Sequence, residues 1–278
     1  MVGPVVAGEC RELSWRSVHR HHDLLVTDLF RLDGRTAVVT GASRGLGRAM
    51  AGALGSAGAR VVLVSRHAED LAVVAAELAD LCEVIAKPLD LSEISSIEAW
   101  VANTWSEVGP VHVVLHSAGV QRRAPASEVE QADWDRIAAV NLKAPFFLSR
   151  EVGKRQIEAD SGGSHIFVGS LTMSIGIAGA ASYAASKAGV AAVVRTLAVE
   201  WAKSGIRVNA LAPGYFRTQL TEGVFQDPER SAWIHSRIPM GRLGLPEELG
   251  GAAVFLASDA SSYVSGAILN IDGGWLAG

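Results

Sequence analysis

Two side chains near the middle of the chain have the types and spacing for proton transfer. Tyr183 and Lys187 are four residues apart in an Ala-rich segment, so a helix would project both from one face. An isolated phenol titrates near pH 10, and bringing its pKa towards 7 requires about 4 kcal/mol of extra stabilisation of the phenolate. A neighbouring ammonium could supply part of it. We therefore expect Tyr183 to act as acid and base, with Lys187 lowering its pKa.

Two further polar residues could complete such a site. Ser170 ends a β-branched run and is separated from Tyr183 by twelve residues, so its hydroxyl could hold a substrate oxygen against the phenol. Asn141 lies in the helical segment that comes next after the run 111–116, and its amide could anchor a water molecule of a proton relay. Tyr-x-x-x-Lys alone is weak evidence, because Tyr and Lys often cover a helix surface. The full spacing becomes specific when a nucleotide-binding turn precedes it.

Such a turn is present near the start of the regular part of the chain. The sequence TGASRGLG, residues 40–47, stands between a predicted strand and a predicted helix. Glycines at these places permit a tight turn and let backbone N–H groups approach a pyrophosphate. In a chain with 29 Gly this spacing of three glycines arises by chance about 0.3 times. The motif is therefore weak alone, and its position between the first predicted strand and helix is what favours a dinucleotide site. We expect dinucleotide contacts from Gly41, Ser43, Arg44, Gly45, Leu46 and Gly47.

The end of the second predicted strand indicates which dinucleotide binds. An acidic residue there would bind the ribose 2′-hydroxyl of NAD, whereas a basic residue accommodates the phosphate of NADP. The chain has Ser65 and Arg66 at this place, no carboxylate before Glu69, and Arg44 in the glycine turn. Guanidinium groups present a charged fork of donors to a phosphate. The alternative is two ordinary surface arginines. The sequence predicts NADP(H) in preference to NAD(H), and an oxidised nicotinamide would also favour the phenolate of Tyr183.

Composition restricts the class of protein that carries these residues. The 278 residues are 49% hydrophobic and 19% charged, which is too apolar for a disordered chain. The net charge of −4 does not favour nucleic-acid binding. No apolar run is long enough to span a membrane, and no secretory signal is recognisable. Two Cys suit a reducing compartment, so we expect a cytoplasmic protein. His19, His21 and His22 form a cluster near the start of the chain, but no Cys or carboxylate stands at a ligand spacing beside them, so we expect no metal site.

Strand and helix patterns alternate from residue 29 onwards. Apolar runs such as VVLV and VHVVLH fit strands covered by helices on both faces. The expected strands are Thr36–Thr40, Arg60–Val64, Val84–Pro88, Val111–His116, His165–Val168, Arg207–Ala212 and Ala267–Ile271. The expected helices are Gly47–Ala57, Ala68–Leu81, Ser95–Glu107, Ala132–Ile157, Ala181–Ser204 and Pro246–Ser258. This order predicts an α/β fold, a single-domain Rossmann-like doubly wound parallel sheet of about seven strands flanked by helices. Residues 29–278 form that domain, and residues 1–28 a poorly ordered extension.

The motifs together resemble the short-chain dehydrogenase/reductase family. They are TGASRGLG at 40–47, LDL at 89–91, HSAG at 116–119, VNL at 140–142, GS at 169–170, YAASK at 183–187, NALAPGYFRT at 209–218 and the closing segment 252–274. The resemblance implies an NADP(H)-dependent oxidoreductase that interconverts a secondary alcohol and a ketone, with catalytic Asn141, Ser170, Tyr183 and Lys187. It also implies that Lys187 binds the nicotinamide ribose. Further nucleotide contacts would come from Asp90, Leu91, Ala118, Gly119, Tyr183, Pro213, Gly214, Phe216 and Thr218.

One motif departs from the family pattern. The family usually has Asn-Asn-Ala-Gly where this chain has His116, Ser117, Ala118 and Gly119. In the family those asparagines mainly tie the central strands together, so the departure concerns local rigidity more than the chemistry. A catalytic role for His116 is a minor alternative, because Tyr183 already supplies the proton.

The substrate is predicted from weaker features. GVQRRAP at 119–125, APGYFRT at 212–218 and IPMGRLGLPEEL at 238–249 resemble the sugar-acid members of the family, the gluconate 5-dehydrogenases and 2-deoxy-D-gluconate (2-keto-3-deoxygluconate) dehydrogenases. Arg122 or Arg123 could pair with an aldonate or ketouronate carboxylate, with Ser170 and Tyr183 at the reacting carbon. The pocket wall would be Leu171–Ala180, and a lid would lie near 215–240. The alternatives are a 3-oxoacyl thioester reductase or other carbonyl reductase, and a NADP-binding redox sensor or scaffold without turnover.

Two long apolar helices are candidates for a subunit interface. The resemblance implies that Ala132–Ile157 and Ala181–Ser204 pair across a subunit interface to build a homotetramer. Two-fold symmetry is the common arrangement in such assemblies.

Overall fold

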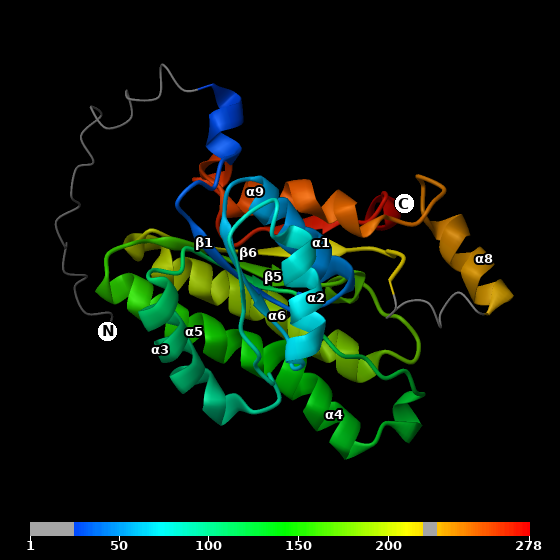
Figure 1. Ribbon diagram of the computed structural model, residues 1–278. Helices are drawn as coiled ribbons and strands as arrows, with labels where there is room; N and C mark the ends of the chain where they lie inside the picture. The colour runs from blue at the N-terminus through cyan, green and yellow to red at the C-terminus, as the bar shows by residue number, and fades with distance from the viewer. Residues whose placement is uncertain (1–24, 219–226) are drawn as a thin grey trace, which may run out of the picture.

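Seven short strands form one parallel sheet at the centre of the molecule. The computed structural model describes residues 25–218 and 227–278 (Figure 1). The strands are β1 (Thr36–Thr40), β2 (Arg60–Val64), β3 (Val84–Ala86), β4 (Val113–His116), β5 (Gly163–Val168), β6 (Ile206–Pro213) and β7 (Ile268–Ile271). Their order in the sheet is β3-β2-β1-β4-β5-β6-β7, and all neighbours are parallel. The predicted doubly wound fold is confirmed, and so are all seven predicted strands, within one or two residues at their ends.

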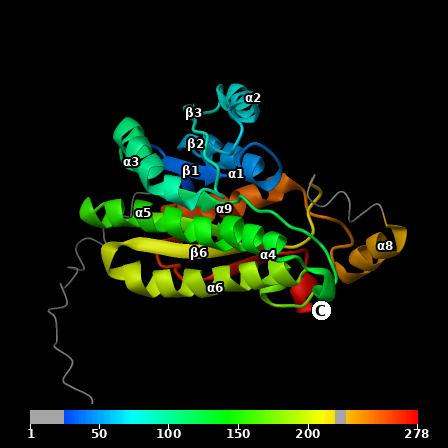
Figure 2. The same cartoon turned by 90° about the horizontal axis from the view of Figure 1, so that it is seen from below.

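Helices cover both faces of the sheet, which is why the central strands are apolar throughout. One face packs against α1 (Gly45–Ser56), α2 (Ala68–Leu78) and α9 (Gly250–Ala257). The other face packs against α3 (Ile97–Val108), α5 (Ala144–Glu158) and α6 (Ala181–Trp201). Alternate residues of one strand serve the two layers: in β4, Val113 and Leu115 face α1 and α9, and Val114 faces α3 and α5. Figure 2 shows the second layer from outside, with α3, α5 and α6 lying side by side over the sheet.

The order of the strands determines where a ligand can bind. From β1 the chain proceeds outwards to β2 and β3, then returns to β4 on the opposite side of β1 and continues to β7. At such a reversal the loops after the two central strands diverge and leave a crevice at their carboxyl ends. The loops after Thr40 and His116, which contain the glycine turn and the HSAG segment, therefore border this crevice.

The predicted helix Ala132–Ile157 is interrupted. It consists of α4 (Gln131–Ala138), a π-helical turn (Ala139–Lys143) and α5, and the N–H of Ala144 donates to the carbonyl of Ala139, five residues earlier. Pro145 explains the interruption, because it lacks an N–H and its ring would clash with the carbonyl of Asn141 in a regular α-helix. The wider turn accommodates the ring.

Two other elements differ from the prediction. The expected helix Pro246–Ser258 begins with a 3₁₀ turn (Pro246–Leu249) before α9. The lid segment contains a helix that the periodicity did not predict, α8 (Pro228–Arg237), whose N-terminus is capped by Asp227 through its carboxylate. Figure 1 shows α8 projecting from the body of the molecule.

The predicted N-terminal extension is described only in part. Within 25–28 the chain enters a 3₁₀ turn (Val26–Phe30), whereas residues 1–24, which include the His19, His21 and His22 cluster, lie outside the described residues. Residues 219–226 of the predicted lid also lie outside them. Within 25–218 and 227–278 no helix combines the length and the apolar character that crossing a bilayer requires.

Candidate active site

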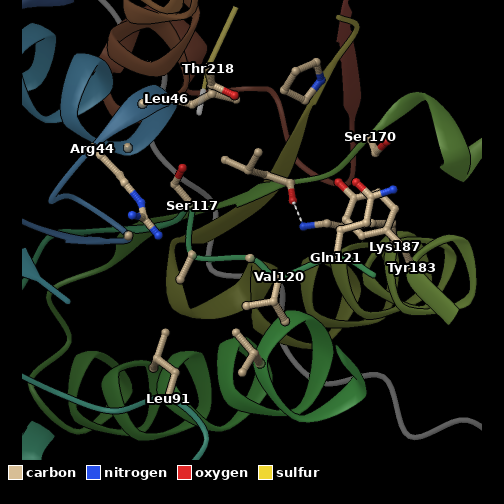
Figure 3. Close-up of a pocket in the computed structure, with 18 of the residues that line it drawn as sticks. Arg44, Leu46, Leu91, Ser117, Val120, Gln121, Ser170, Tyr183, Lys187 and Thr218 are labelled. Carbon is tan, nitrogen blue, oxygen red and sulfur yellow. Dashed lines mark hydrogen bonds between the residues drawn. The ribbon is translucent and has the colours of Figure 1, made fainter. Parts of the chain in front are cut away.

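A cavity of about 890 Å³ occupies the crevice at the carboxyl ends of the strands. Its volume suits a nucleotide together with a small substrate. Its lining includes every predicted nucleotide-contacting residue and three of the four predicted catalytic residues. These are Gly41, Ser43, Arg44, Gly45, Leu46, Gly47, Ser65, Arg66, Asp90, Leu91, Ala118, Gly119, Ser170, Tyr183, Lys187, Pro213, Gly214, Phe216 and Thr218. Figure 3 shows Arg44 and Leu46 on one side of the cavity and Ser170, Tyr183 and Lys187 on the other.

The glycine turn leaves backbone donors at one end of the cavity. Helix α1 starts at Gly45, and no side chain of residues 25–218 or 227–278 caps its N-terminus, so its first N–H groups are available to an anion. Gly47 lies against the turn: a Cβ there would overlap the carbonyl oxygen of Gly41. Gly41 itself has φ +68°, in the left-handed region that favours glycine. This close-packed, uncapped turn fits the pyrophosphate of a dinucleotide.

Charged and polar side chains surround the predicted adenosine end. Arg66 is exposed and lines the cavity after β2, and His67 and Asp70 follow it. Asp90 of the same lining accepts hydrogen bonds from the N–H and the hydroxyl of Ser92 at 2.9 and 2.7 Å. Burial alone would raise the pKa of Asp90, but these hydrogen bonds and the charge of Arg66 lower it. The positive charge of Arg66 is therefore close enough to Asp90 to stabilise its carboxylate.

The predicted proton-transfer groups meet at the other end of the cavity. The Ser170 hydroxyl follows β5, accepts the N–H of Thr172 at 3.2 Å and hydrogen bonds with the Tyr183 phenol. Lys187 is one helical turn after Tyr183 on α6, and its Nζ lies 5.7 Å from the centroid of the phenol ring. That Nζ donates to the carbonyl of Val168 at 2.7 Å (Figure 3). The arrangement can place a carbonyl oxygen between Ser170 and Tyr183.

The pKa of the phenol is not lowered in the way that the sequence predicted. Burial raises the pKa of Tyr183 above its ordinary value, and the hydrogen bond with Ser170 and the charge of Arg123 oppose that rise only in part. The Lys187 ammonium is directed to the Val168 carbonyl instead of the phenol oxygen, and burial lowers its own pKa to about 8. In this state Tyr183 is a proton donor at neutral pH.

Asn141 lies beside the cavity and not in its lining. Its Oδ1 accepts the N–H of Val120 at 2.8 Å, and its Nδ2 donates to the carbonyl of Val120 at 2.9 Å and to Ser186 at 3.2 Å. Both amide hydrogens are therefore used within the protein. The structure gives the amide a different task from the predicted relay water, because it holds the loop at Val120, which lines the cavity.

The two candidate substrate arginines have different environments. Arg122 is exposed and forms an ion pair with Asp133 at 2.7 Å, beside a smaller cavity of about 290 Å³. Arg123 lines the main cavity, and its Nη1 is buried with no hydrogen-bond partner among the described residues. Its charge lowers the pKa of Tyr183, so the guanidinium is near the phenol. The structure brings Arg123 to the predicted catalytic group and leaves Arg122 outside.

Several residues of the lining were not found from the sequence, among them Gln121, Arg136 and Tyr215. Tyr215 was within reach, because it lies inside the motif APGYFRT from which Phe216 was selected. It belongs to a small apolar cluster behind the cavity that joins the loop after β5, α8 and the end of the chain. That cluster is Leu171, Tyr215, Ile234, Ile238 and Trp275. The α8 part of the predicted lid thus supports the cavity wall from behind.

Comparisons with known proteins identify the family. A family model described as enoyl-(acyl carrier protein) reductase matches residues 41–276. The chain belongs to the short-chain dehydrogenase/reductase family. It is 40% identical over 252 residues to a 2-dehydro-3-deoxy-D-gluconate 5-dehydrogenase from Pseudoalteromonas atlantica, a match that covers 89% of this chain and 98% of the relative. The family prediction and the enzyme class, an NAD(P)-dependent dehydrogenase of CH–OH groups, are confirmed.

Two further short-chain dehydrogenases give the same result. A gluconate 5-dehydrogenase from Gluconobacter oxydans is 39% identical over 248 residues, which is 89% of this chain and 96% of the relative. The crystal structure of a gluconate 5-dehydrogenase from Burkholderia cenocepacia, in complex with NADP and tartrate, superposes with a TM-score of 0.88 at 36% identity. It covers 91% of this chain and 100% of the other.

Proposed function

We propose that this short-chain dehydrogenase interconverts a hydroxy sugar acid and its keto acid with NADP(H). The substrate class is supported above all by one observation: Nη1 of Arg123 is buried in the cavity near Tyr183 and has no hydrogen-bond partner in the part of the chain that the structure describes. A buried guanidinium nitrogen without an acceptor is costly, and a carboxylate is the acceptor whose geometry and charge match it. Aldonates and ketouronates carry that carboxylate a few bonds from a secondary alcohol or ketone.

Each residue of the site has a separate role in the proposed reaction. Ser170 and Tyr183 hold the reacting oxygen, and the phenol gives its proton to that oxygen during reduction and takes it back during oxidation. Lys187, fixed on the Val168 carbonyl, places a positive charge beside the phenol ring and binds the nicotinamide ribose. The bound nicotinamide supplies or accepts the hydride, and its oxidised form adds a positive charge that favours the phenolate. Asn141 holds the loop at Val120 in place.

We also propose that NADP(H) is preferred to NAD(H). Arg66 is exposed at the cavity after β2, where the ribose 2′-phosphate would lie, and Arg44 of the glycine turn lines the same cavity. Asp70 lines this end as well, but it is in the first turn of α2, five residues beyond Ser65. The NADP complex of the B. cenocepacia relative supports the same assignment.

A paired comparison of substrates and variants tests the substrate class. With NADP+ we compare gluconate with glucitol, a neutral polyol of the same carbon number, and with NADPH we compare 5-ketogluconate with an acetoacetyl thioester. We expect turnover of the acids and a rise in their KM of about 30-fold in Arg123→Gln, the cost of about 2 kcal/mol for one charge-assisted pair. Arg122→Gln is the matched control and should change KM less than about two-fold, because Arg122 is paired with Asp133.

Other outcomes would favour other functions. Activity on the thioester alone would identify a 3-oxoacyl thioester reductase, and equal activity on glucitol and gluconate would remove the role of Arg123. Tight nucleotide binding without any turnover would favour a redox sensor or scaffold.

The homotetramer remains a proposal that exposed apolar side chains support. Trp134 on α4, Ile157 on α5 and Val199 on α6 are all exposed, on the helices that are expected to pair. Light scattering at micromolar concentration tests the assembly, and a stable monomer would contradict it.

A further inference from the structure

A chain of buried polar side chains lies beneath the crevice and outside the lining of the cavity. His116 ends β4, His165 is in β5, and Ser149 and Gln156 lie two turns apart on α5. His116 Nε2 is 2.7 Å from Ser149 Oγ, which is 3.0 Å from His165 Nδ1. His165 Nε2 is 2.9 Å from Gln156 Oε1, and Gln156 Nε2 donates to the carbonyl of Val111 at 2.9 Å. The four side chains are at most 3% exposed.

The hydrogen bond from Gln156 to Val111 determines which atom donates in each of the other hydrogen bonds of this series. The Val111 carbonyl can only accept, so the Gln156 amide nitrogen faces it and Gln156 Oε1 accepts from His165 Nε2–H. Burial lowers the pKa of His165 to about 3, so the ring is neutral and its Nδ1 accepts the Ser149 hydroxyl proton. Ser149 Oγ then accepts from His116 Nε2–H. His116 is therefore the neutral tautomer with a bare lone pair on Nδ1.

That lone pair has no donor among the described residues, although it is buried. An unpaired buried acceptor is costly, so a donor is expected beside it. One face of the His116 ring is covered by Phe167, with centroids 4.5 Å apart, and Phe167 cannot donate. The titratable groups that act on His116 are His165 of β5 and Lys187 of α6, and from α5 it meets the Ser149 hydroxyl. Lys187 reaches the same end of the sheet: it donates one of its three N–H groups to the carbonyl of Val168, and Val168 follows Phe167, which pairs with His116 in the register of β4 and β5.

We propose that His116 is a positioning residue for Lys187, and that its Nδ1 accepts a hydrogen bond from a buried water molecule shared with the Lys187 ammonium. The chain from Gln156 to Ser149 keeps Nδ1 free of a proton, so the acceptor is always available. The inference rests on the proposed role of Lys187 at Tyr183. It also gives a task to the residue that departs from the family motif.

Spectroscopy of the wild-type protein tests the tautomers without any risk of misfolding. In protein labelled with [¹⁵N]histidine, with NADP+ bound, two-bond ¹H–¹⁵N correlations report which ring nitrogen carries the proton. We expect His116 and His165 to be neutral and protonated on Nε2 from pH 6 to 8, with His116→Asn used for assignment. A charged His116 ring, or a proton on its Nδ1, would overturn the proposal.

Kinetics test the link to Lys187. The rate of alcohol oxidation rises with pH as Tyr183 loses its proton, and the Lys187 charge lowers the pKa of that step. We expect His116→Phe to raise the apparent pKa of kcat by about one unit, which is a loss of about ten-fold at pH values below it. His116→Asn should restore the wild-type profile, because its Oδ1 occupies the place of Nδ1. Ser149→Ala, which frees the tautomer but leaves the ring, should give a shift between the two.

The outcomes distinguish this inference from the proposed function. A loss of kcat at every pH with an unchanged apparent pKa, and no rescue by Asn, would show a structural role and refute the positioning role. If the wild-type enzyme turned over none of the proposed substrates, the function would fail while the tautomer measurement would still decide the state of His116.

Discussion

The two ends of the crevice are built in different ways. The nucleotide end is made mainly of main chain from one turn, residues 40–47, where N–H groups at the start of α1 face the cavity. The substrate end is made of side chains from four separate segments, represented by Arg123, Ser170, Tyr183 and Tyr215. A site made of main chain is sensitive to an added Cβ, whereas a site made of side chains is sensitive to the loss of a functional group. The two ends should therefore respond to opposite kinds of substitution.

The largest effect is expected at the substrate end, from the loss of one hydroxyl group. Tyr183→Phe removes the only hydroxyl that we assign to proton transfer, so kcat should fall about 10³-fold. Nucleotide affinity, measured by NADPH fluorescence, should change less than about two-fold. The matched control is Tyr263→Phe, because Tyr263 is fully exposed. Retention of more than about a tenth of kcat in Tyr183→Phe would remove Tyr183 from the mechanism.

An added methyl group tests the nucleotide end. In Gly47→Ala the Cβ would overlap the carbonyl oxygen of Gly41, so the turn must move, and we expect the Kd for NADPH to rise about 100-fold. Gly176→Ala is the control, because a Cβ at Gly176 meets no atom of the described residues within 4 Å. Equal nucleotide affinity in both variants, at unchanged melting temperature, would show that the turn does not define the nucleotide site.

The choice of nucleotide should depend on one exposed side chain. Arg66→Gln removes a partner of the 2′-phosphate, so the ratio of kcat/KM for NADP+ to that for NAD+ should fall about 20-fold, or nearly 2 kcal/mol. The control is Arg48→Gln on α1, whose guanidinium is paired with Glu77. A ratio that does not change in Arg66→Gln would place the phosphate contact elsewhere.

The smallest effect is expected from the wall behind the substrate. Trp233 of α8 is half-exposed and meets Trp275 edge to face, with centroids 5.5 Å apart. Such a pair contributes about 1 kcal/mol, so Trp233→Ala should raise the substrate KM about three- to five-fold and leave the nucleotide Kd unchanged. Met240→Ala, an exposed change just beyond α8, should alter neither. A change in nucleotide affinity would show that the two ends are not separate.

The same contrast explains what the sequence could predict. The glycine turn and the trio of Ser170, Tyr183 and Lys187 were found because each is defined by local spacing and each follows a recognisable strand. The alternation of apolar runs was sufficient for the order of strands and helices, because covered parallel strands are apolar on both faces. These features depend on neighbours in the chain, so local reasoning was enough.

Other features depend on contacts between residues that are far apart in the sequence, or on which of two residues of the same type meets a partner. Arg122 and Arg123 look alike in the sequence, and only the position of Asp133, one helix later, decides which one is withdrawn from the cavity. The raised pKa of Tyr183 results from burial and from the direction of the Lys187 ammonium, which spacing along a helix does not determine. The chain of hydrogen bonds from His116 joins two strands and a helix, so no single segment contains it.

The π-helical turn at Ala139–Lys143 has a consequence for comparing sequences. It contains one residue more than an unbroken α-helix would need between the same end points. Deleting a single residue there would remove the wide turn, so the ring of Pro145 would clash with the carbonyl four residues before it, and Asn141 would rotate by about 100° away from Val120. A relative with a one-residue gap at this place would therefore lose the anchor of the loop that Asn141 provides at Val120.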